Sequence, residues 1–277
     1  MTWRAMLITA VLTSAADPIV EPSVISSPAA EVRVAYSPDG QRVLWGSIGR
    51  EAAEDQQDIW EIHRTKSGWS RPARVSFDTA AVEFDPAFSA DGHQLYFDSD
   101  RSGGFGGTDI YVVDVDPATG DFSAARNLGP GINSPGDEWA PTPTAKGRLI
   151  FSSDGWGGYG KHDLFEAQPG AAARPVNLGR LINGPDEDFD AALTPDGTQL
   201  IFSSGQMSDT AAHVELYTSR HSSRGWGPRS RLGIGCSDFV IGAAIDSHDP
   251  TSLLYSAKCA GGLGRMDIHR TKLPASS

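Results

Sequence analysis

The sequence predicts an all-β fold, a five-bladed β-propeller of four-stranded antiparallel blades, and two observations carry that prediction. First, a unit made of a turn, an apolar run and an acid-led run recurs five times, and its acid falls at residues 58, 109, 163, 215 and 267. The steps of 51, 54, 52 and 52 residues are typical of a repeated β unit. Second, the runs are aromatic and β-branched, the breaks are rich in Gly, Asp, Asn and Pro, and no apolar stripe of helical period exceeds two turns.

Each repeat is predicted to contain four strands. In the second repeat these are the run 86–88 before the turn at Asp91-Gly92, then 95–97, 109–115 and 124–128. Four-stranded units of roughly 50 residues are typical of propeller blades. The prediction is therefore one propeller domain, 17–277, with blades at about 31–82, 83–136, 137–186, 187–237 and 238–277.

The fifth repeat ends after its third strand, near Thr271, whereas residues 18–24 belong to no repeat. We expect this N-terminal segment to supply the missing fourth strand of the last blade, because that closes the ring and removes two open sheet edges. An open ring, or a sixth blade built from residues 17–30, is the alternative, although fourteen residues are too few for a blade.

Several segments also resemble a known family. DPAFSADG at 85–92 and LYFDSDRSGGFGGTDIY at 95–111 are similar to the WD-repeat-like β-propeller of TolB-type periplasmic proteins, and so are NLGPGINSPGDE at 127–138 and NLGRLINGPDE at 177–187. The resemblance covers about residues 31–270. It implies protein–protein contacts in the cell envelope. The sequence has no counterpart of TolB's amino-terminal domain, so TolB's own partner contacts do not carry over.

Charge and the N-terminus restrict the partners and the compartment. The net charge is −12 at pH 7, which disfavours nucleic acid and anionic lipid surfaces but suits a cationic protein, a metal ion or a neutral glycan. Arg4, the apolar run 5–12 and the small residues 13–16 predict a signal peptide, 1–16, and thus a periplasmic or secreted protein. No other segment has the ~20 apolar residues of a membrane span, so we expect no membrane insertion, and we expect a monomer.

Two cysteines, Cys236 and Cys259, are the only ones in the chain. In an exported protein they are predicted to form a disulfide, since one falls in a linker and the other in a loop on the same face of the propeller. Two free thiols are the alternative for a cytosolic protein.

Acidic residues recur where each first strand begins: Glu31, Glu83, Glu138 and Asp188, with Asp238 as the expected fifth member. First strands surround the central channel, so these acids, thickened by Asp85 and Asp190, predict a negative ring at one mouth. They either cap neighbouring backbone or capture a cation or a Lys/Arg-rich segment. Trp139, Trp156 and Tyr159 fall on the same face and are predicted to add an aromatic contact surface.

The function predicted from these features is an exported, non-catalytic module that binds a protein, peptide or glycan. No nucleophile elbow and no HExxH sequence is present, and His93, His162 and His269 are expected to be solvated rather than metal ligands. We therefore expect no metal site and no cofactor, with Ca²⁺ at the repeated acids as an alternative. The alternative function is a carbohydrate-active enzyme, a glycosidase or lyase, that uses Asp85 and Asp190 in the channel.

Overall fold

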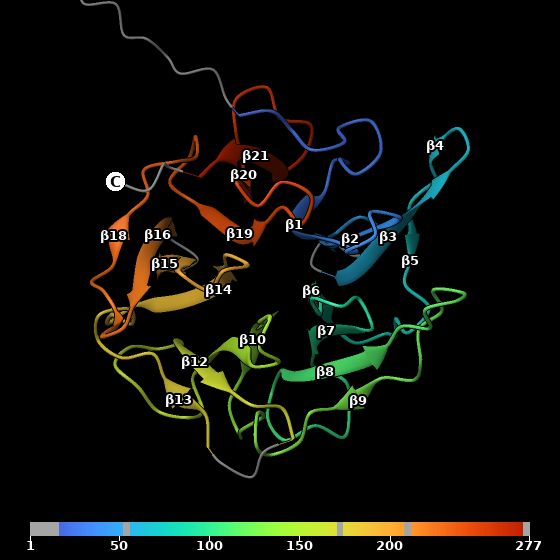
Figure 1. The fold of residues 1–277 in the computed structure, drawn as a ribbon. Coiled ribbons are helices and arrows are strands. Elements are labelled where there is room, and N and C mark those ends of the chain that lie inside the picture. The colour runs from blue at the N-terminus through green and yellow to red at the C-terminus, as the bar shows by residue number, and fades with distance from the viewer. Residues whose placement is uncertain (1–16, 52–55, 171–173, 208–211, 274–277) are drawn as a thin grey trace, which may run out of the picture.

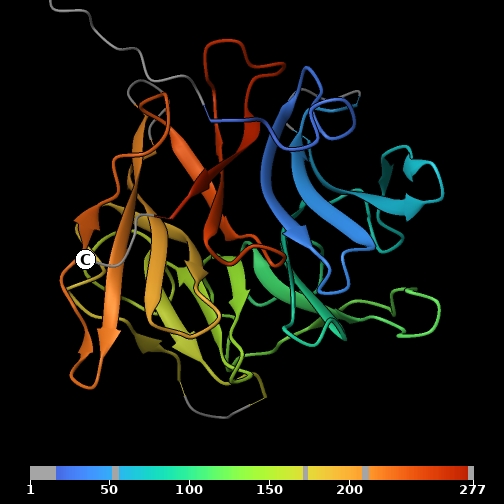
Figure 2. The same ribbon diagram turned by 45° about the horizontal axis from the view of Figure 1, so that its top comes forward.

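The chain forms a ring of five antiparallel β-sheets in a computed structural model that describes residues 17–51, 56–170, 174–207 and 212–273. Figure 1 views this ring along its axis, with one inner strand of each sheet around the centre, and Figure 2 shows it tilted. The described residues form strands, turns and loops without a helix. The predicted five-bladed propeller is confirmed, whereas the predicted signal peptide, 1–16, lies outside the described residues.

The second and third blades have the four strands expected of each repeat. Their strands, from the centre outwards, are β6 (Glu83–Phe88), β7 (Gln94–Ser99), β8 (Asp109–Asp114) and β9 (Arg126–Asn127), then β10 (Glu138–Pro143), β11 (Leu149–Ser153), β12 (Asp163–Ala167) and β13 (Val176–Asn177). The second strands are almost wholly buried because both faces of each sheet pack against a neighbouring blade. This burial explains why they read as continuous apolar runs rather than as alternating ones.

The first and fourth blades split their outermost strand into two short pieces. Their strands are β1 (Ala30–Tyr36), β2 (Arg42–Ile48), β3 (Gln57–Thr65), β4 (Gly68–Trp69) and β5 (Ala73–Arg74), then β14 (Glu187–Leu193), β15 (Gln199–Gln206), β16 (His213–Ser222), β17 (Gly225–Trp226) and β18 (Ser230–Arg231). In each, the long third strand pairs with a hairpin at its tip and with the second piece farther back.

The last blade has three strands of its own, β19 (Val240–Ile245), β20 (Ser252–Ala257) and β21 (Asp267–Lys272), and the N-terminal segment closes it. Ile19 bridges His269 in antiparallel fashion, Val20 N–H donates to Ile268 O over 2.8 Å, and Arg270 N–H donates to Pro18 O over 2.9 Å. The predicted closure by the N-terminal segment is confirmed. Only residues 18–20 of the predicted strand pair, because the chain then turns at 21–25.

The core consists of five apolar clusters, one between each pair of adjacent blades. The cluster between the fifth and first blades contains Val20 and Ile25 of the closing segment together with Trp45 and Leu254. Cys259 belongs to the cluster between the fourth and fifth blades, and it forms the predicted disulfide with Cys236, with Cα atoms 5.4 Å apart. None of the described segments forms a helix long and apolar enough to cross a membrane.

Every inner strand carries a β-bulge at the same place. The register of each is broken there, and one residue has a left-handed backbone with φ between 46° and 67°; these residues are Arg33, Asp85, Ala140, Asp190 and Gly242. Four of the five are not glycine, which is uncommon for a left-handed conformation. The bulge directs backbone N–H groups to the neighbouring blade: Ala140 N–H donates to Asp98 Oδ2 and Gly242 N–H to Asp190 Oδ2, over 2.9 and 2.6 Å.

Candidate binding site at the central channel

The candidate site is a pocket of about 340 Å³ at one mouth of the central channel, and all five blades line it. Its wall is made by the residue that precedes the bulge in each inner strand: Val32, Phe84, Trp139, Phe189 and Ile241. Met207, Phe239 and Met266 complete an apolar rim. The bulges therefore position the wall, since the residue before a bulge faces the channel in every blade. The volume is at the lower end of the ~300–1,000 Å³ usual for ligand pockets.

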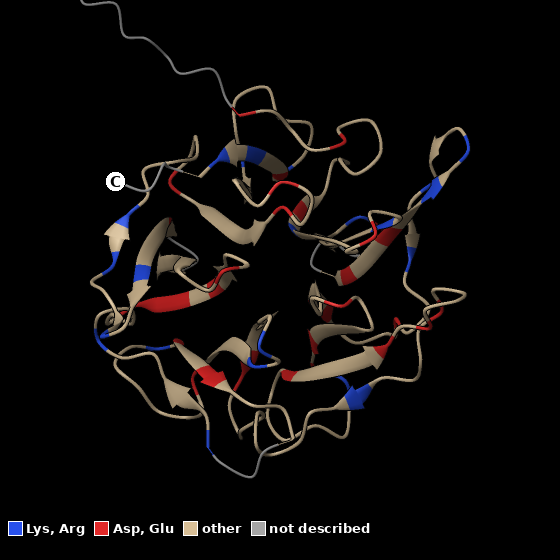
Figure 3. Ribbon diagram, viewed as in Figure 1, with Lys and Arg blue, Asp and Glu red and all other residues tan. Residues whose placement is uncertain are grey.

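The floor of this pocket is charged. Asp85 and Asp190, two of the bulge residues, lie there with Asp98 of β7. The guanidinium of Arg33, the bulge residue of β1, lies 3.6 Å from Asp190 and also donates to Pro141 O and Thr142 Oγ1 over 2.9 and 2.8 Å. Figure 3 shows how acidic residues gather on the inner strands, above all on β14. Three carboxyl groups thus share one guanidinium in a buried cluster.

Burial shifts the protonation of these acids. It raises the pKa of Asp98 from 3.8 to about 7, with the backbone N–H of Ala140 and the charge of Arg33 opposing the rise. Burial, reinforced by repulsion from Asp190 and Asp98, raises the pKa of Asp85 well above its ordinary range, and burial also raises the pKa of Asp190. A hydrogen bond between Asp85 and Asp98 favours the protonated form of Asp85 and the ionised form of Asp98.

One oxygen in this cluster lacks a partner. Asp85 Oδ1 is buried and has no hydrogen-bond partner among the described residues, although Asp85 itself lines the pocket. A buried polar atom in this state costs about 1–3 kcal/mol relative to a satisfied one. A ligand that donates a hydrogen bond or carries a positive charge would remove that cost. Asp85 is therefore the residue that a ligand is expected to contact.

Sequence reasoning identified Asp85 and Asp190 but missed Arg33 and Asp98. Both residues differ in type from the residues at the equivalent positions of the other blades. Asp98 occupies a position filled by Gly46, Ser152, Ser203 and Ser256 in the other blades, and Arg33 is the one cation among the bulge residues. The available signals were therefore a single charged residue among small ones for Asp98, and a single cation among acidic and small residues for Arg33.

The four acids predicted to ring the channel mouth lie just behind the wall instead. Glu31, Glu83, Glu138 and Asp188 are fully buried, and each bonds to the residue four positions earlier and to groups on its own blade. Glu138, for example, accepts from Ser134 N–H, Ser134 Oγ and Ser153 Oγ over 2.8, 2.6 and 2.6 Å. This geometry corresponds to the capping interpretation. The fifth member of the column is Val240, not the exposed Asp238, because Val240 holds the equivalent register in β19.

The predicted aromatic residues do not form one surface. Trp139 lines the central pocket, whereas Trp156 and Tyr159 lie in the β11–β12 loop and border a separate shallow hollow of about 420 Å³. Trp156 is half-buried and donates from Nε1 to Ile132 O over 2.8 Å. Tyr159 is 39% exposed, with the guanidinium of Arg180 over its ring.

Two of the three histidines expected to be solvated are buried. His162 and His269 are 6% and 1% exposed, while His93 is exposed as expected. Each of the two is fixed by an acceptor: His162 Nδ1 lies 2.8 Å from Glu187, and His269 Nδ1 lies 2.9 Å from the carbonyl of Asp17. The expectation was wrong because His162 directly precedes β12 at a packed strand end, and His269 lies within β21 between β20 and the closing segment.

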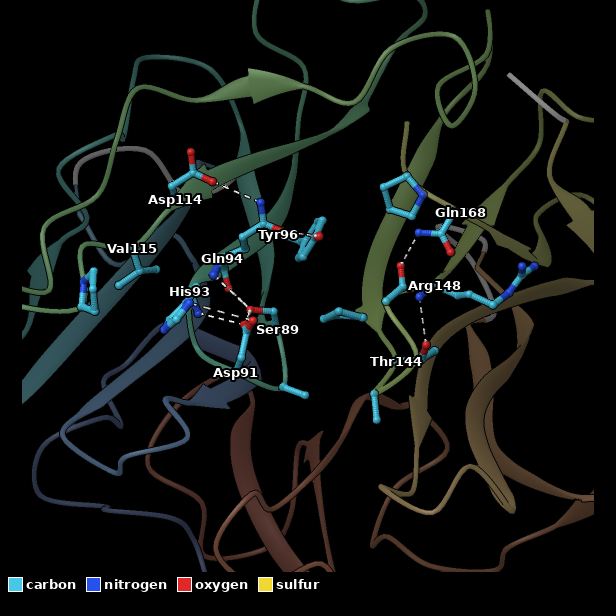
Figure 4. Close-up of a pocket in the computed structure, with 16 residues that line it drawn as sticks. Ser89, Asp91, His93, Gln94, Tyr96, Asp114, Val115, Thr144, Arg148 and Gln168 are labelled. Carbon is cyan, nitrogen blue, oxygen red and sulfur yellow. Dashed lines mark hydrogen bonds and ion pairs between the residues drawn. The ribbon is translucent and has the colours of Figure 1, made fainter. Parts of the chain in front are cut away.

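A second hollow, of about 790 Å³, is a groove between the second and third blades, at the turns that join the first two strands of each. Figure 4 shows Asp91 and Tyr96 on one side of it and Arg148 and Gln168 on the other. Its polar groups satisfy one another: Tyr96 donates to Gln94, Gln94 donates to Asp114, and Gln168 donates to Gly147 O, all within 3.1 Å. Arg148 Nε is buried in this groove without a hydrogen-bond partner among the described residues, but it forms an ion pair with Glu166 at 2.9 Å, whereas Asp85 Oδ1 in the central pocket has neither.

No family model and no curated protein sequence matches this chain. Similar solved structures include TolB from Acinetobacter baumannii, with a TM-score of 0.56 and 14% identity over 88% of this chain; the chain spans 55% of the length of that TolB. A gluconolactonase from Xanthomonas campestris gives 0.53 and 12% over 95% of this chain and 87% of that one. The catalytic domain of a GH62 α-L-arabinofuranosidase from Coprinopsis cinerea gives 0.50 and 12%, over 94% of each. Similarity at this identity shows the propeller fold alone, shared by TolB and by enzymes.

Proposed function

We propose that this protein is an exported, non-catalytic binding module whose central pocket receives a lysine or arginine side chain of a partner protein or peptide. The observation that carries the proposal is the composition of the pocket, an apolar wall above a floor on which three carboxyl groups share one guanidinium. The aliphatic stem of the entering side chain would pack against the wall, and its charged end would reach the floor. The net charge of −12 favours a cationic partner.

Asp85 is the group that the entering cation would meet. Its Oδ1 lacks a partner among the described residues, and burial raises its pKa well above the ordinary range, which favours the protonated form in the empty pocket. A cation beside a carboxyl group favours the ionised form. Binding should therefore release a proton, and the affinity should rise with pH as the cost of ionising Asp85 falls.

The compartment is part of the proposal. The Cys236–Cys259 disulfide and the signal-like pattern at 1–16 both support export to the periplasm or cell exterior, where disulfides persist. A neutral glycan suits the pocket less well than a peptide does, since Gln57 and Thr108 are the uncharged polar side chains along a wall that is otherwise apolar.

The test is titration calorimetry of the full chain with short synthetic peptides that differ only in a central Lys, Arg or Glu. We expect the Lys and Arg peptides to bind with a proton release and the Glu peptide not to bind. Asp85→Asn should weaken binding by about tenfold or more, because a charge-assisted contact is lost. Asp91→Asn, an exposed acid on the opposite face, is the matched control. Equal binding of all three peptides, or no effect of Asp85→Asn, would contradict the proposal.

The second candidate is a carbohydrate-active enzyme, and the raised pKa values of Asp85 and Asp98 favour it, because a carboxyl group that is protonated near pH 7 suits a general acid. Asp190, paired with Arg33, would be the ionised partner. This candidate requires turnover of oligosaccharides that Asp85→Asn and Asp190→Asn both abolish. Turnover that persists in both variants would eliminate it.

A further inference from the structure

Beside the pocket, three potential metal ligands of the third blade converge. A carboxylate oxygen of Asp137, one of Asp154 and a ring nitrogen of His162 all lie within 4.8 Å of one another. Asp137 precedes β10, Asp154 follows β11 and His162 precedes β12, so the register of one blade brings them together. A metal with ~2.1 Å bonds holds its ligand atoms up to about 4 Å apart, so a small rotation of the exposed Asp154 would complete the geometry.

The state of His162 is what distinguishes this group from an ordinary acidic cluster. The residue is 6% exposed, Nδ1 lies 2.8 Å from Glu187 Oε2, and the ring stacks on Trp139 with centroids 3.6 Å apart. Its Nε2 is buried and has no hydrogen-bond partner among the described residues. Metal-bound histidines usually have this arrangement, in which a carboxylate orients the ring through one nitrogen and leaves the other to the metal.

The two aspartates each commit one oxygen to the backbone. Asp137 Oδ1 accepts from Thr108 N–H over 2.7 Å, and Asp154 Oδ1 accepts from Asp137 N–H over 2.8 Å. These bonds fix both carboxylates. Neither bond uses the Oδ2 atom of its aspartate. The second oxygens can therefore coordinate an ion without dismantling the loop.

The equivalent positions of other blades show that this group of three ligands is not a feature of the repeat itself. In the second blade Asp100 makes the same backbone bond, to Val82 N–H over 2.8 Å, so an acid at that position serves the loop. The three positions together are held by Val82, Asp100 and Thr108 in the second blade, by Glu187, Gly205 and Val214 in the fourth, and by Phe239, Lys258 and Met266 in the fifth. The third blade alone combines three ligating side chains, which the repeat does not require.

We propose that Asp137, Asp154 and His162 bind a divalent transition-metal ion of the zinc type, with Glu187 orienting the imidazole. An imidazole nitrogen with two carboxylates suits Zn²⁺, whereas Ca²⁺ prefers an all-oxygen set. Trp139 joins this site to the central pocket, because it packs on His162 and lines the pocket wall. Sequence reasoning expected no metal, since the three ligands are not adjacent in the chain and only the strand register brings them together.

The experiment is calorimetric titration of the metal-free full chain with ZnCl₂, repeated with Co²⁺, whose visible absorption reports coordination by protein ligands. We expect one Zn²⁺ per chain, and we expect binding to fall about tenfold or more in Asp154→Asn and in His162→Gln. Asp100→Asn is the matched control, at the equivalent position of the second blade, and should bind like the wild type. Millimolar Ca²⁺ should not displace the ion.

Absence of saturable Zn²⁺ binding, unchanged binding in Asp154→Asn, or displacement by Ca²⁺ would each overturn the proposal. Asp154→Asn keeps the test decisive if His162→Gln does not fold, because Asp154 is exposed and asparagine retains the acceptor for Asp137 N–H. The outcome is independent of the peptide experiment, which concerns Asp85 at the pocket floor.

Discussion

Arg33 determines how three acids can be buried together at the bottom of the channel. Its guanidinium faces Asp190 and hydrogen-bonds to the third blade, while Asp85 donates a proton to a hydrogen bond with Asp98. Asp85 Oδ1 still lacks a partner among the described residues, and burial raises the pKa of all three acids, because removing solvent penalises each ionised carboxyl group. Such groups should make the stability of the protein depend on pH.

Asp98 is the acid at which this dependence can be tested. Burial raises its pKa from 3.8 to about 7, so the folded state holds this proton more tightly than the unfolded state does. Its stabilising contribution is present below about pH 4 and is lost as the pH rises through about 7. Asp98→Asn removes this loss and keeps an acceptor for Ala140 N–H. Between pH 5 and pH 8 the free energy of unfolding should fall by roughly 2 kcal/mol more in the wild type than in Asp98→Asn.

Urea unfolding at the two pH values measures this difference. Glu31 and Asp188 also have raised pKa values, but they are common to both proteins, so their contributions cancel in the comparison. Asp91→Asn serves as the control, because the hydrogen bond from Ser89 lowers the pKa of Asp91 and its titration lies below this range. Parallel pH profiles for the wild type and Asp98→Asn would show that Asp98 titrates normally.

At the scale of the strand, the bulge is the element that forms the site. The residue before the bulge lines the wall in every blade, and two of the bulge residues, Asp85 and Asp190, reach the floor. In the fifth blade the bulge also brings Gly242 against the first blade, where an added Cβ would meet Arg33 N at 2.8 Å and Ser256 Oγ at 3.0 Å. Glycine is needed there for space as well as for its φ of 67°.

Substitution tests this requirement. Gly242→Ala should destabilise the protein by about 3 kcal/mol, since a left-handed alanine costs ~1–2 kcal/mol and the clash adds to it. Gly261→Ala is the matched control: Gly261 has a φ of 84° but open space around its Cβ, so we expect about 1 kcal/mol. Thermal unfolding of the two variants measures the difference. If both variants lose the same free energy of unfolding, the neighbouring atoms at Gly242 move aside for the added methyl group without an energetic penalty.

The same bulges explain what the sequence could and could not predict. The repeats and the turns follow from local patterns, and Asp91 indeed caps its turn by accepting from His93 N–H over 3.1 Å. The disulfide follows from the strand order, which places both cysteines on one face. Which side chains line the channel cannot be predicted in this way. Side chains of a regular strand alternate between its two faces, and a bulge interrupts that alternation. Glu83 therefore lies buried behind the wall, while Asp85, two residues later, reaches the floor. The proximity of Asp98 and Arg33 to this floor could not be predicted from the sequence either, because they come from different blades.

At the scale of the molecule, the ring depends on joining its two ends. Five clusters between blades form a continuous core only if the fifth blade packs against the first, and Val20 and Ile25 take part in that contact. The closing segment also covers the outer edge of β21 through Val20 N–H and Pro18 O. Figure 1 shows this segment outside β21, at the seam of the ring. An uncovered edge of this kind pairs readily with another chain.

Val20→Pro tests the closure, because proline removes the N–H that bonds to Ile268 O while the position remains apolar. We expect the free energy of unfolding to fall by about 3 kcal/mol, a decrease of roughly 6–12 °C in Tm for a chain of this size, together with dimers or larger species in size-exclusion chromatography. Val20→Ala keeps the N–H and loses only buried methyl groups, so it should cost about 1–2 kcal/mol and leave the protein as a single species. If both variants melt alike and neither associates, the hydrogen-bonded edge contributes nothing to closure, and apolar packing between the fifth and first blades holds the ring by itself.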